Sequence, residues 1–217
     1  WVTMMLTNLT PIFGLKSKAQ EIIYLLKDVK RVVRQGFYET ELPLVEEFCK
    51  KNNLFIVRSK FKILLADETS FSNKGIKIPG DDPRSGMYFV YISKNEHDAF
   101  LANYHELTDN VQDLGRILGY PNCCIDFFMK RFTEDNPNLQ LKPTNVYTNL
   151  TRREHDAVLI SHFPCSSDCE QSIKIGKKFF NVIFETDSER AQELLTLLMP
   201  KQTRISVYEP MNHSVKN

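Results

Sequence analysis

Four of the five cysteines in this 217-residue chain lie in two short stretches, residues 119–128 and 162–169. Each pair of cysteines follows a proline, Pro121 in the first stretch and Pro164 in the second. Proline at a first helical position is pre-organised for helix entry, so both pairs are predicted to lie at helix starts. The free N–H groups and the dipole of a helix start stabilise negative charge, including a thiolate. We therefore predict that the two stretches meet and form one sulfur-rich site.

The spacing within each stretch indicates how the thiols are presented. Cys165 and Cys169 are four residues apart, which on a helix places both thiols on one face. Cys123 and Cys124 are adjacent, so on a helix their side chains point about 100° apart. In the leading interpretation all four cysteines bind one metal ion or an iron–sulfur cluster, because thiolates suit zinc and iron–sulfur centres.

This spacing differs from the two x-x-spaced pairs of common zinc fingers, so other ligand sets stay open. One variant uses three thiolates with His162 or His105 as the fourth ligand. Three protein ligands and an open position suit catalysis, whereas four protein ligands suit a structural ion. Two further interpretations need no metal: disulfide or redox chemistry between the stretches, and small buried thiols that only pack together.

A few polar residues near the cysteines are candidates for supporting roles. His162 precedes Cys165 by three residues and is a candidate extra ligand or proton carrier. The pair His105-Glu106 is a candidate base if its helix faces the same cleft. Asp126 and Asp168 are carboxylates close to the cysteines and are candidates to orient a ligand by hydrogen bonding.

Hydrophobic periodicity predicts an α+β fold with helices in the majority. A small sheet in the N-terminal half is covered by helices, and the cysteine-bearing C-terminal half is mostly helical. The expected portions are residues 1–94 and 95–217, or one continuous domain. Predicted helices span residues 17–35, 40–51, 95–107, 108–118, 121–132, 167–184 and 188–199; predicted strands span 54–58, 61–65, 87–93, 157–163 and 205–208; residues 70–86 and 133–148 are predicted to be irregular.

Composition limits the class of protein. The formal net charge of +1 gives no strong nucleic-acid signal, and no apolar run reaches the roughly 18 residues of a membrane-spanning helix. An odd, unevenly spaced set of five cysteines is unlike a secreted disulfide framework, so a cytoplasmic location with reduced or metal-bound thiols is expected. The sequence starts at Trp1 and not at Met, as expected if further residues precede it in the natural protein. No P-loop, GxGxxG, GxSxG or HExxH motif is present, so the sequence names no reaction.

Both cysteine stretches resemble one family of prokaryotic domains without an established activity. The resemblance rests on residues 118–125, with the segment GYPxCC, and residues 162–169, with the segment HxPCSxxC. It covers about residues 105–180 and implies that the following residues belong to one shared feature: Gly119, Pro121, Cys123, Cys124, His162, Pro164, Cys165 and Cys169.

The leading functional hypothesis is a metal- or iron–sulfur-binding cytoplasmic protein whose reaction and partners are unknown. A second hypothesis is a non-catalytic interaction module in which the cysteines pin two segments together. A third is a thiol redox protein. An open coordination position beside a cleft would favour catalysis, and a closed site would favour a structural role.

Overall fold

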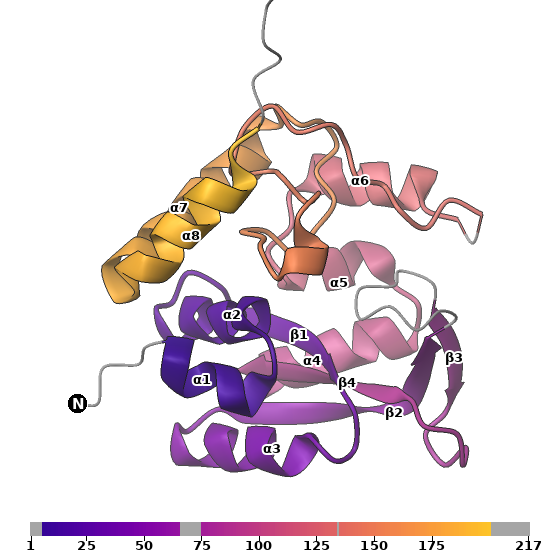
Figure 1. Ribbon diagram of the computed structural model, residues 1–217. Coiled ribbons are helices and arrows are strands. Elements are labelled where there is room, and N and C mark those ends of the chain that lie inside the picture. The colour runs from indigo at the N-terminus through magenta and orange to yellow at the C-terminus, as the bar shows by residue number, and fades with distance from the viewer. Residues whose placement is uncertain (1–5, 66–74, 134, 201–217) are drawn as a thin grey trace, which may run out of the picture.

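The computed structural model describes residues 6–65, 75–133 and 135–200 (Figure 1). These residues form an α+β fold, as predicted, with one four-stranded antiparallel sheet in the N-terminal half. The spatial order of its strands is β1 (Val32–Phe37), β4 (Met87–Ser93), β2 (Phe55–Leu65) and β3 (Gly75–Pro79). The helices are α1 (Leu6–Phe13), α2 (Lys16–Leu26), α3 (Leu42–Lys51), α4 (Glu96–Leu107), α5 (Val111–Ile117), α6 (Asn122–Arg131), α7 (Glu170–Thr186) and α8 (Ser188–Leu198), with a short 3-10 turn η1 (Arg153–His155).

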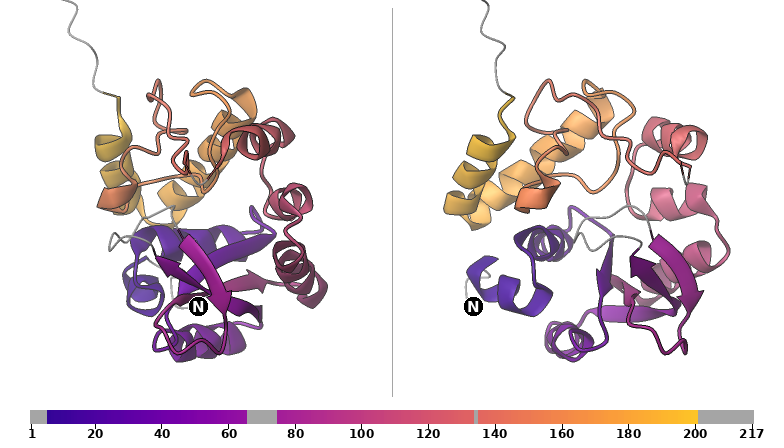
Figure 2. Two further views of the ribbon diagram at one scale, coloured as in Figure 1. Left: turned by 90° about the vertical axis from the view of Figure 1, so that its right-hand side faces the viewer. Right: turned by 45° about the vertical axis from the view of Figure 1, so that its right-hand side comes forward.

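Helices cover both faces of the sheet (Figures 1 and 2). Successive side chains of a strand point to opposite faces. On β4, Val90 and Ile92 are therefore buried in the main core with residues of α1, α2 and α3, whereas Tyr91 lies in a second core with residues of α4. The prediction of a strand over residues 87–93 is confirmed. This strand, β4, pairs with both β1 and β2 and contributes side chains to both cores.

The C-terminal helices share the main core with the N-terminal half. α7 packs against α8 and against α2, and the rings of Tyr24 and Phe179 stack with centroids 4.1 Å apart. Leu159 and Ile183 are buried in the same cluster as the apolar residues of α2. The segment that carries the second cysteine pair is thereby held against the sheet-bearing half. No helix in the described ranges is long and apolar enough to cross a membrane.

The prediction of a helix over residues 17–35 is wrong after Leu26. The positive φ of Asp28, +58°, takes the chain out of the helix, and Val32 begins strand β1. Val32 and Val33 fit a helical spacing with the residues before them, but both pair with β4. Valine is β-branched and favours a strand, and tertiary pairing with β4 decides the outcome.

Two predicted strands are one continuous element. The sequence predicts one strand over residues 54–58 and another over 61–65, whereas the structure has a single strand, β2, that continues from Phe55 to Leu65. Its pairing with β4 shifts register between Arg58 and Lys62, which marks a bulge. The polar Ser59-Lys60 pair therefore bends one strand instead of ending it.

Two further predictions, a loop over residues 70–86 and a strand over residues 157–163, also need correction. The predicted loop over 70–86 contains the edge strand β3, whose residues 75–79 pair with β2. Residues 157–163, predicted as a strand, are irregular in conformation. Ala157 and Ile160 in this segment are buried in the main core, so the apolar run reflects burial and not sheet pairing. The predicted strand over 205–208 lies outside the described residues.

Candidate metal centre

A sharp turn between α5 and α6 presents the first cysteine pair. Gly119 adopts a φ of +80°, a conformation that glycine tolerates, and its N–H donates to the carbonyl of Arg116. Pro121 then caps α6, so it stands one position earlier than predicted. Cys123 and Cys124 lie in the first turn of α6, where the sequence placed them.

The second pair is brought together by a turn, and the prediction that both thiols lie on one helix is wrong. α7 begins at Glu170, so Cys169 is its cap and Cys165 lies in irregular chain. The Cys169 N–H donates to the carbonyl of Ser166 at 3.1 Å, which closes the turn. Pro164 consequently leads into this turn and not into a helix.

The four sulfur atoms lie close together, with all pairs within 4.8 Å of one another. The Sγ of Cys169 is 3.8 Å from that of Cys123 and 3.7 Å from that of Cys124. The two adjacent cysteines have their Sγ atoms 3.9 Å apart. Four thiolates around one tetrahedral zinc ion, with Zn–S bonds of about 2.3 Å, would have their sulfurs about 3.8 Å apart. The arrangement is thus compatible with a metal site.

The cluster is buried on one side and open on the other. Cys124 and Cys169 are buried, Cys165 is intermediate and Cys123 is exposed. The fifth cysteine, Cys49, is buried in the main core and is not part of this group. Burial raises the pKa of the Cys49 thiol to about 12, in keeping with a packing role.

Hydrogen bonds connect the cluster to His162. The backbone N–H of Cys165 donates to Sγ of Cys124 at 3.4 Å. The hydroxyl of Ser172 lies 3.2 Å from the same sulfur and 2.8 Å from Nε2 of His162. His162 therefore reaches the cluster through Ser172. Sequence reasoning missed Ser172, although its position one helical turn after Cys169 is a signal that could have found it.

The pKa values of the thiols differ within the cluster. Burial raises the pKa of Cys124 and raises that of Cys165 to about 11. Burial also acts to raise the pKa of Cys169, but hydrogen bonds with the side chain and backbone of Ser172, and with Cys165 and Cys124, together outweigh it, and this pKa is lowered to about 7. Cys169 is thus the first thiolate to form among these three. A divalent cation would favour the thiolate form of the others as well.

Polar side chains hold the turn that carries the second pair. The carbonyl of Ser167 accepts hydrogen bonds from Nδ2 of Asn145 at 2.8 Å and from the hydroxyl of Thr148 at 2.6 Å. Oδ1 of Asn145 accepts from the N–H of Tyr147, an Asx-type turn that orders the irregular chain. The roles of Asn145 and Thr148 were not predicted, because an Asn-rich stretch indicates irregular chain but does not indicate which residues its side chains contact.

The remaining candidates lie apart from the four sulfurs. Glu106 on α4 forms a bidentate ion pair with Arg34 and accepts a hydrogen bond from the hydroxyl of Tyr91. Asp126 is exposed on α6, and Asp168 is exposed and accepts a hydrogen bond from Thr144 at 2.6 Å.

His105 also lies on α4. Its Nδ1 is buried and has no hydrogen-bond partner within the described ranges. The group of residues within ligand reach of one another contains neither this histidine nor His162.

The fold and the cluster define an α+β protein with four cysteines gathered at one site. Residues 97–199, just under half of the chain, match the family model described as "Protein of unknown function (DUF483)". This range includes all four clustered cysteines and His162. The prediction of an uncharacterised family is therefore confirmed. No curated protein and no solved structure matches the chain.

Proposed function

We propose that Cys123, Cys124, Cys165 and Cys169 bind one zinc ion as four thiolates. The supporting observation is that the Sγ atoms of Cys123, Cys124 and Cys169 lie 3.7–3.9 Å from one another, close to the edge of a zinc–thiolate tetrahedron, with that of Cys165 within 4.8 Å of them. A four-iron cluster has a separate iron behind each thiolate, so its four sulfurs would lie considerably further apart. The compact group favours a single ion over a cluster.

In this proposal the ion is structural. Four protein thiolates complete a tetrahedral site and leave no open position for a substrate. The ion would join the first turn of α6 to the turn before α7 and so fix these two segments to one another. The ion would thereby stabilise the conformation of this region, which could belong to an interaction module or to a larger site. Zinc–thiolate bonds require reduced cysteines, in agreement with the cytoplasmic location expected from the sequence.

The test is metal analysis with visible absorption of protein purified without oxygen or chelators. About one zinc per chain and no visible band are expected. Cys165→Ser should lower the zinc content, because it removes one ligand. Cys49→Ala is the matched control and should retain zinc, because Cys49 lies outside the cluster.

Other outcomes would overturn the proposal in distinct ways. Iron with inorganic sulfide would identify a cluster. Iron without sulfide would keep the four-thiolate site but replace the metal. No metal, with thiols that titrate or form disulfides, would remove the metal site altogether.

A thiol redox role is the second candidate, and one observation favours it. The pKa of Cys169 is lowered to about 7, and its sulfur lies 3.8 Å from that of the exposed Cys123. A thiol partly ionised near neutral pH beside an accessible partner is suited to disulfide exchange. This role predicts a reversible Cys123–Cys169 disulfide in metal-free protein, detected by mass spectrometry after oxidation and lost in Cys169→Ser.

A further inference from the structure

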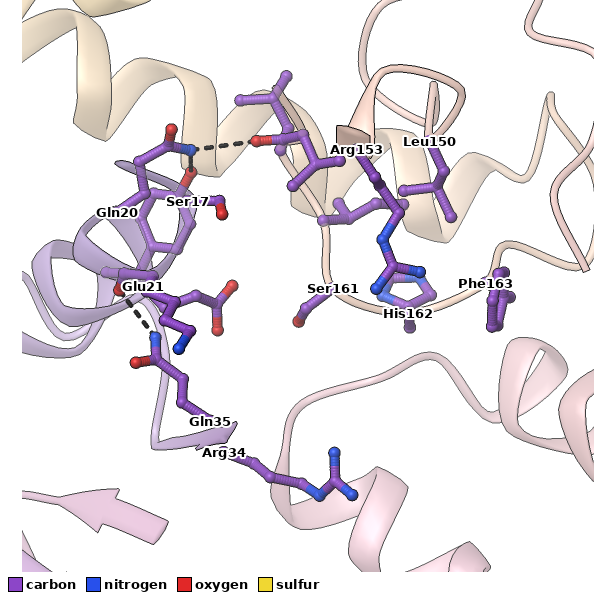
Figure 3. Close-up of a pocket in the computed structure, with 15 residues that line it drawn as sticks. Ser17, Gln20, Glu21, Arg34, Gln35, Leu150, Arg153, Ser161, His162 and Phe163 are labelled. Carbon is purple, nitrogen blue, oxygen red and sulfur yellow. Dashed lines mark hydrogen bonds between the residues drawn. The ribbon is translucent and has the colours of Figure 1, made fainter. Parts of the chain in front are cut away.

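A cavity of about 140 Å³ is lined in part by His162, the residue that reaches the cysteine cluster through Ser172. Its walls come from α2, from β1 and from residues 150–163 (Figure 3). The volume is below the roughly 300–1,000 Å³ typical of pockets for drug-sized ligands. The cavity therefore suits a small ligand and not a nucleotide cofactor.

Positive charge predominates among the side chains that line this cavity. Lys18, Arg34 and Arg153 contribute three cations, and Glu21 contributes the one carboxylate. Glu21 is itself paired with the buried Lys30, just as Arg34 is paired with Glu106 behind it.

Burial makes this positive charge costly. Burial lowers the pKa of Arg153 below its usual range, with Tyr120 acting in the opposite direction. Burial likewise lowers the pKa of Lys18, although Glu41 and Asp156 oppose the shift. A bound anion would stabilise both cations, because an opposite charge favours the charged form of a buried group.

The uncharged polar groups of the wall complement the cations. Ser161 accepts a hydrogen bond from Nζ of Lys30 at 2.9 Å and lies 3.4 Å from the hydroxyl of Tyr120. Burial and then Lys30 lower the pKa of His162 to about 3, so its ring is neutral near pH 7. Figure 3 shows the guanidinium of Arg153 extending toward His162, with Ser161 and Glu21 to the left of it and Arg34 at the bottom of the view.

We propose that this cavity binds a small oxyanion, a phosphate or carboxylate group, with Arg153 and Arg34 as its main charged contacts and Ser161 as a hydrogen-bond donor. The planar guanidinium matches both kinds of group by forming paired, charge-assisted hydrogen bonds. The anion site is separate from the metal centre and connects to it through His162, Ser172 and Cys124. It does not depend on whether the four cysteines bind zinc.

The test is calorimetric titration of the full chain, as purified, with inorganic phosphate at constant ionic strength. Saturable binding to one site is expected. Arg153→Gln should weaken it about ten- to a hundredfold, the usual effect of losing a hydrogen bond between charged groups. Arg152→Gln is the matched control, because Arg152 is the neighbouring residue and does not line the cavity. It should change the affinity less than about twofold, as expected of a surface substitution.

A parallel titration with malonate separates the two anion sources. Tighter phosphate binding assigns a phosphate-bearing ligand, and tighter malonate binding assigns a carboxylate. Absence of saturable binding of either anion to the unaltered chain would overturn the proposal. Equal loss in the two arginine variants would also overturn it, since that result indicates surface charge alone.

A second measurement needs no variant and covers the case in which Arg153→Gln fails to fold. Phenylglyoxal modifies accessible guanidinium groups, and peptide mass spectrometry locates each modified arginine. The anion should slow modification of Arg153 and leave that of Arg152 unchanged. Equal modification of Arg153 with and without the anion contradicts the proposed site.

Discussion

Gly176→Ala should destabilise the protein, because Gly176 lies where α7 touches irregular chain. This buried glycine faces Tyr147, and a Cβ added to it would stand 2.8 Å from both the Cβ and the carbonyl oxygen of Tyr147. Carbon atoms in favourable contact are about 3.5–4.0 Å apart, so the added methyl group would be about 0.7 Å too close. The obstructing atoms include backbone, which does not move aside as the end of a side chain would.

Two opposing terms set the magnitude. Alanine in place of glycine within a helix favours folding by about 0.5–1 kcal/mol. Overpacking of a filled contact costs about 1–3 kcal/mol. We therefore expect a net loss of about 1 kcal/mol in the free energy of unfolding, with up to about 2 kcal/mol if the backbone of Tyr147 cannot shift.

The loss should also reach the cysteine turn. Tyr147 lies between Asn145 and Thr148, whose side chains hold the carbonyl of Ser167. If the methyl group displaces this segment, the turn with Cys165 and Cys169 loses its support. Zinc retention against a competing chelator should therefore fall together with stability.

The assay is urea unfolding followed by circular dichroism, with linear extrapolation to water. Lys174→Ala is the matched control, because Lys174 is exposed on the same helix, and its effect should stay within about 0.5 kcal/mol. An unfolding free energy for Gly176→Ala equal to or above that of the unaltered protein would refute the reasoning. That result would mean that the contact with Tyr147 relaxes at no cost.

Three further predictions concern charge. The pKa of His162 is about 3 in the folded protein and about 6.5 in the unfolded chain, so between these values only the unfolded chain binds the proton. Lowering the pH from 6.5 to 4 should therefore reduce the free energy of unfolding, by at most about 1.4 kcal/mol per pH unit from this residue. In urea unfolding, His162→Gln should show a shallower decrease over this range, and identical slopes for the two proteins would contradict the prediction. The proposed zinc site should bind zinc more tightly at pH 9 than at pH 6, because the pKa values of Cys124 and Cys165 are raised and zinc must displace their protons. Calorimetry in buffers of different ionisation enthalpy would count the protons released. Asp156, whose own φ is +53°, accepts hydrogen bonds from the N–H groups of Lys16 and Ser17 at the start of α2. Asp156→Ala should lower the free energy of unfolding by about 1–2 kcal/mol, and Asp156→Asn by less, because asparagine can still accept a hydrogen bond and tolerates a positive φ. Thermal unfolding measures both losses, and equal losses would show that the cap is not the cause.

The sequence allowed the convergence of the cysteines to be predicted, because prolines, glycine and clustered thiols are local signals. Pro121 and Gly119 mark the turn into α6, and the structure has both features there. The second pair was located correctly but with the wrong local structure. A spacing of four suits a helix, and only the hydrogen bond from Cys169 to Ser166 shows that a turn brings the thiols together.

The parts that could not be predicted depend on contacts distant in sequence. Val32 and Val33 fit a helix until β4 supplies hydrogen-bonding partners, which places them in a strand. The cavity needs α2, β1 and the chain around Arg153 side by side, a juxtaposition of segments more than a hundred residues apart. Hydrophobic periodicity records the environment of each segment but not which partner provides it.

The position of the cysteines on either side of an irregular stretch has a consequence for the unfolded chain. An ion bound to both pairs cross-links residues 41 apart, such as Cys124 and Cys165. In the chain-entropy treatment of cross-links, closing a loop of this length removes unfolded-state freedom equivalent to about 4 kcal/mol. Doubling the loop would change this closure term by only about 0.6 kcal/mol. The stabilisation from loop closure therefore depends only weakly on the length of the segment between the pairs.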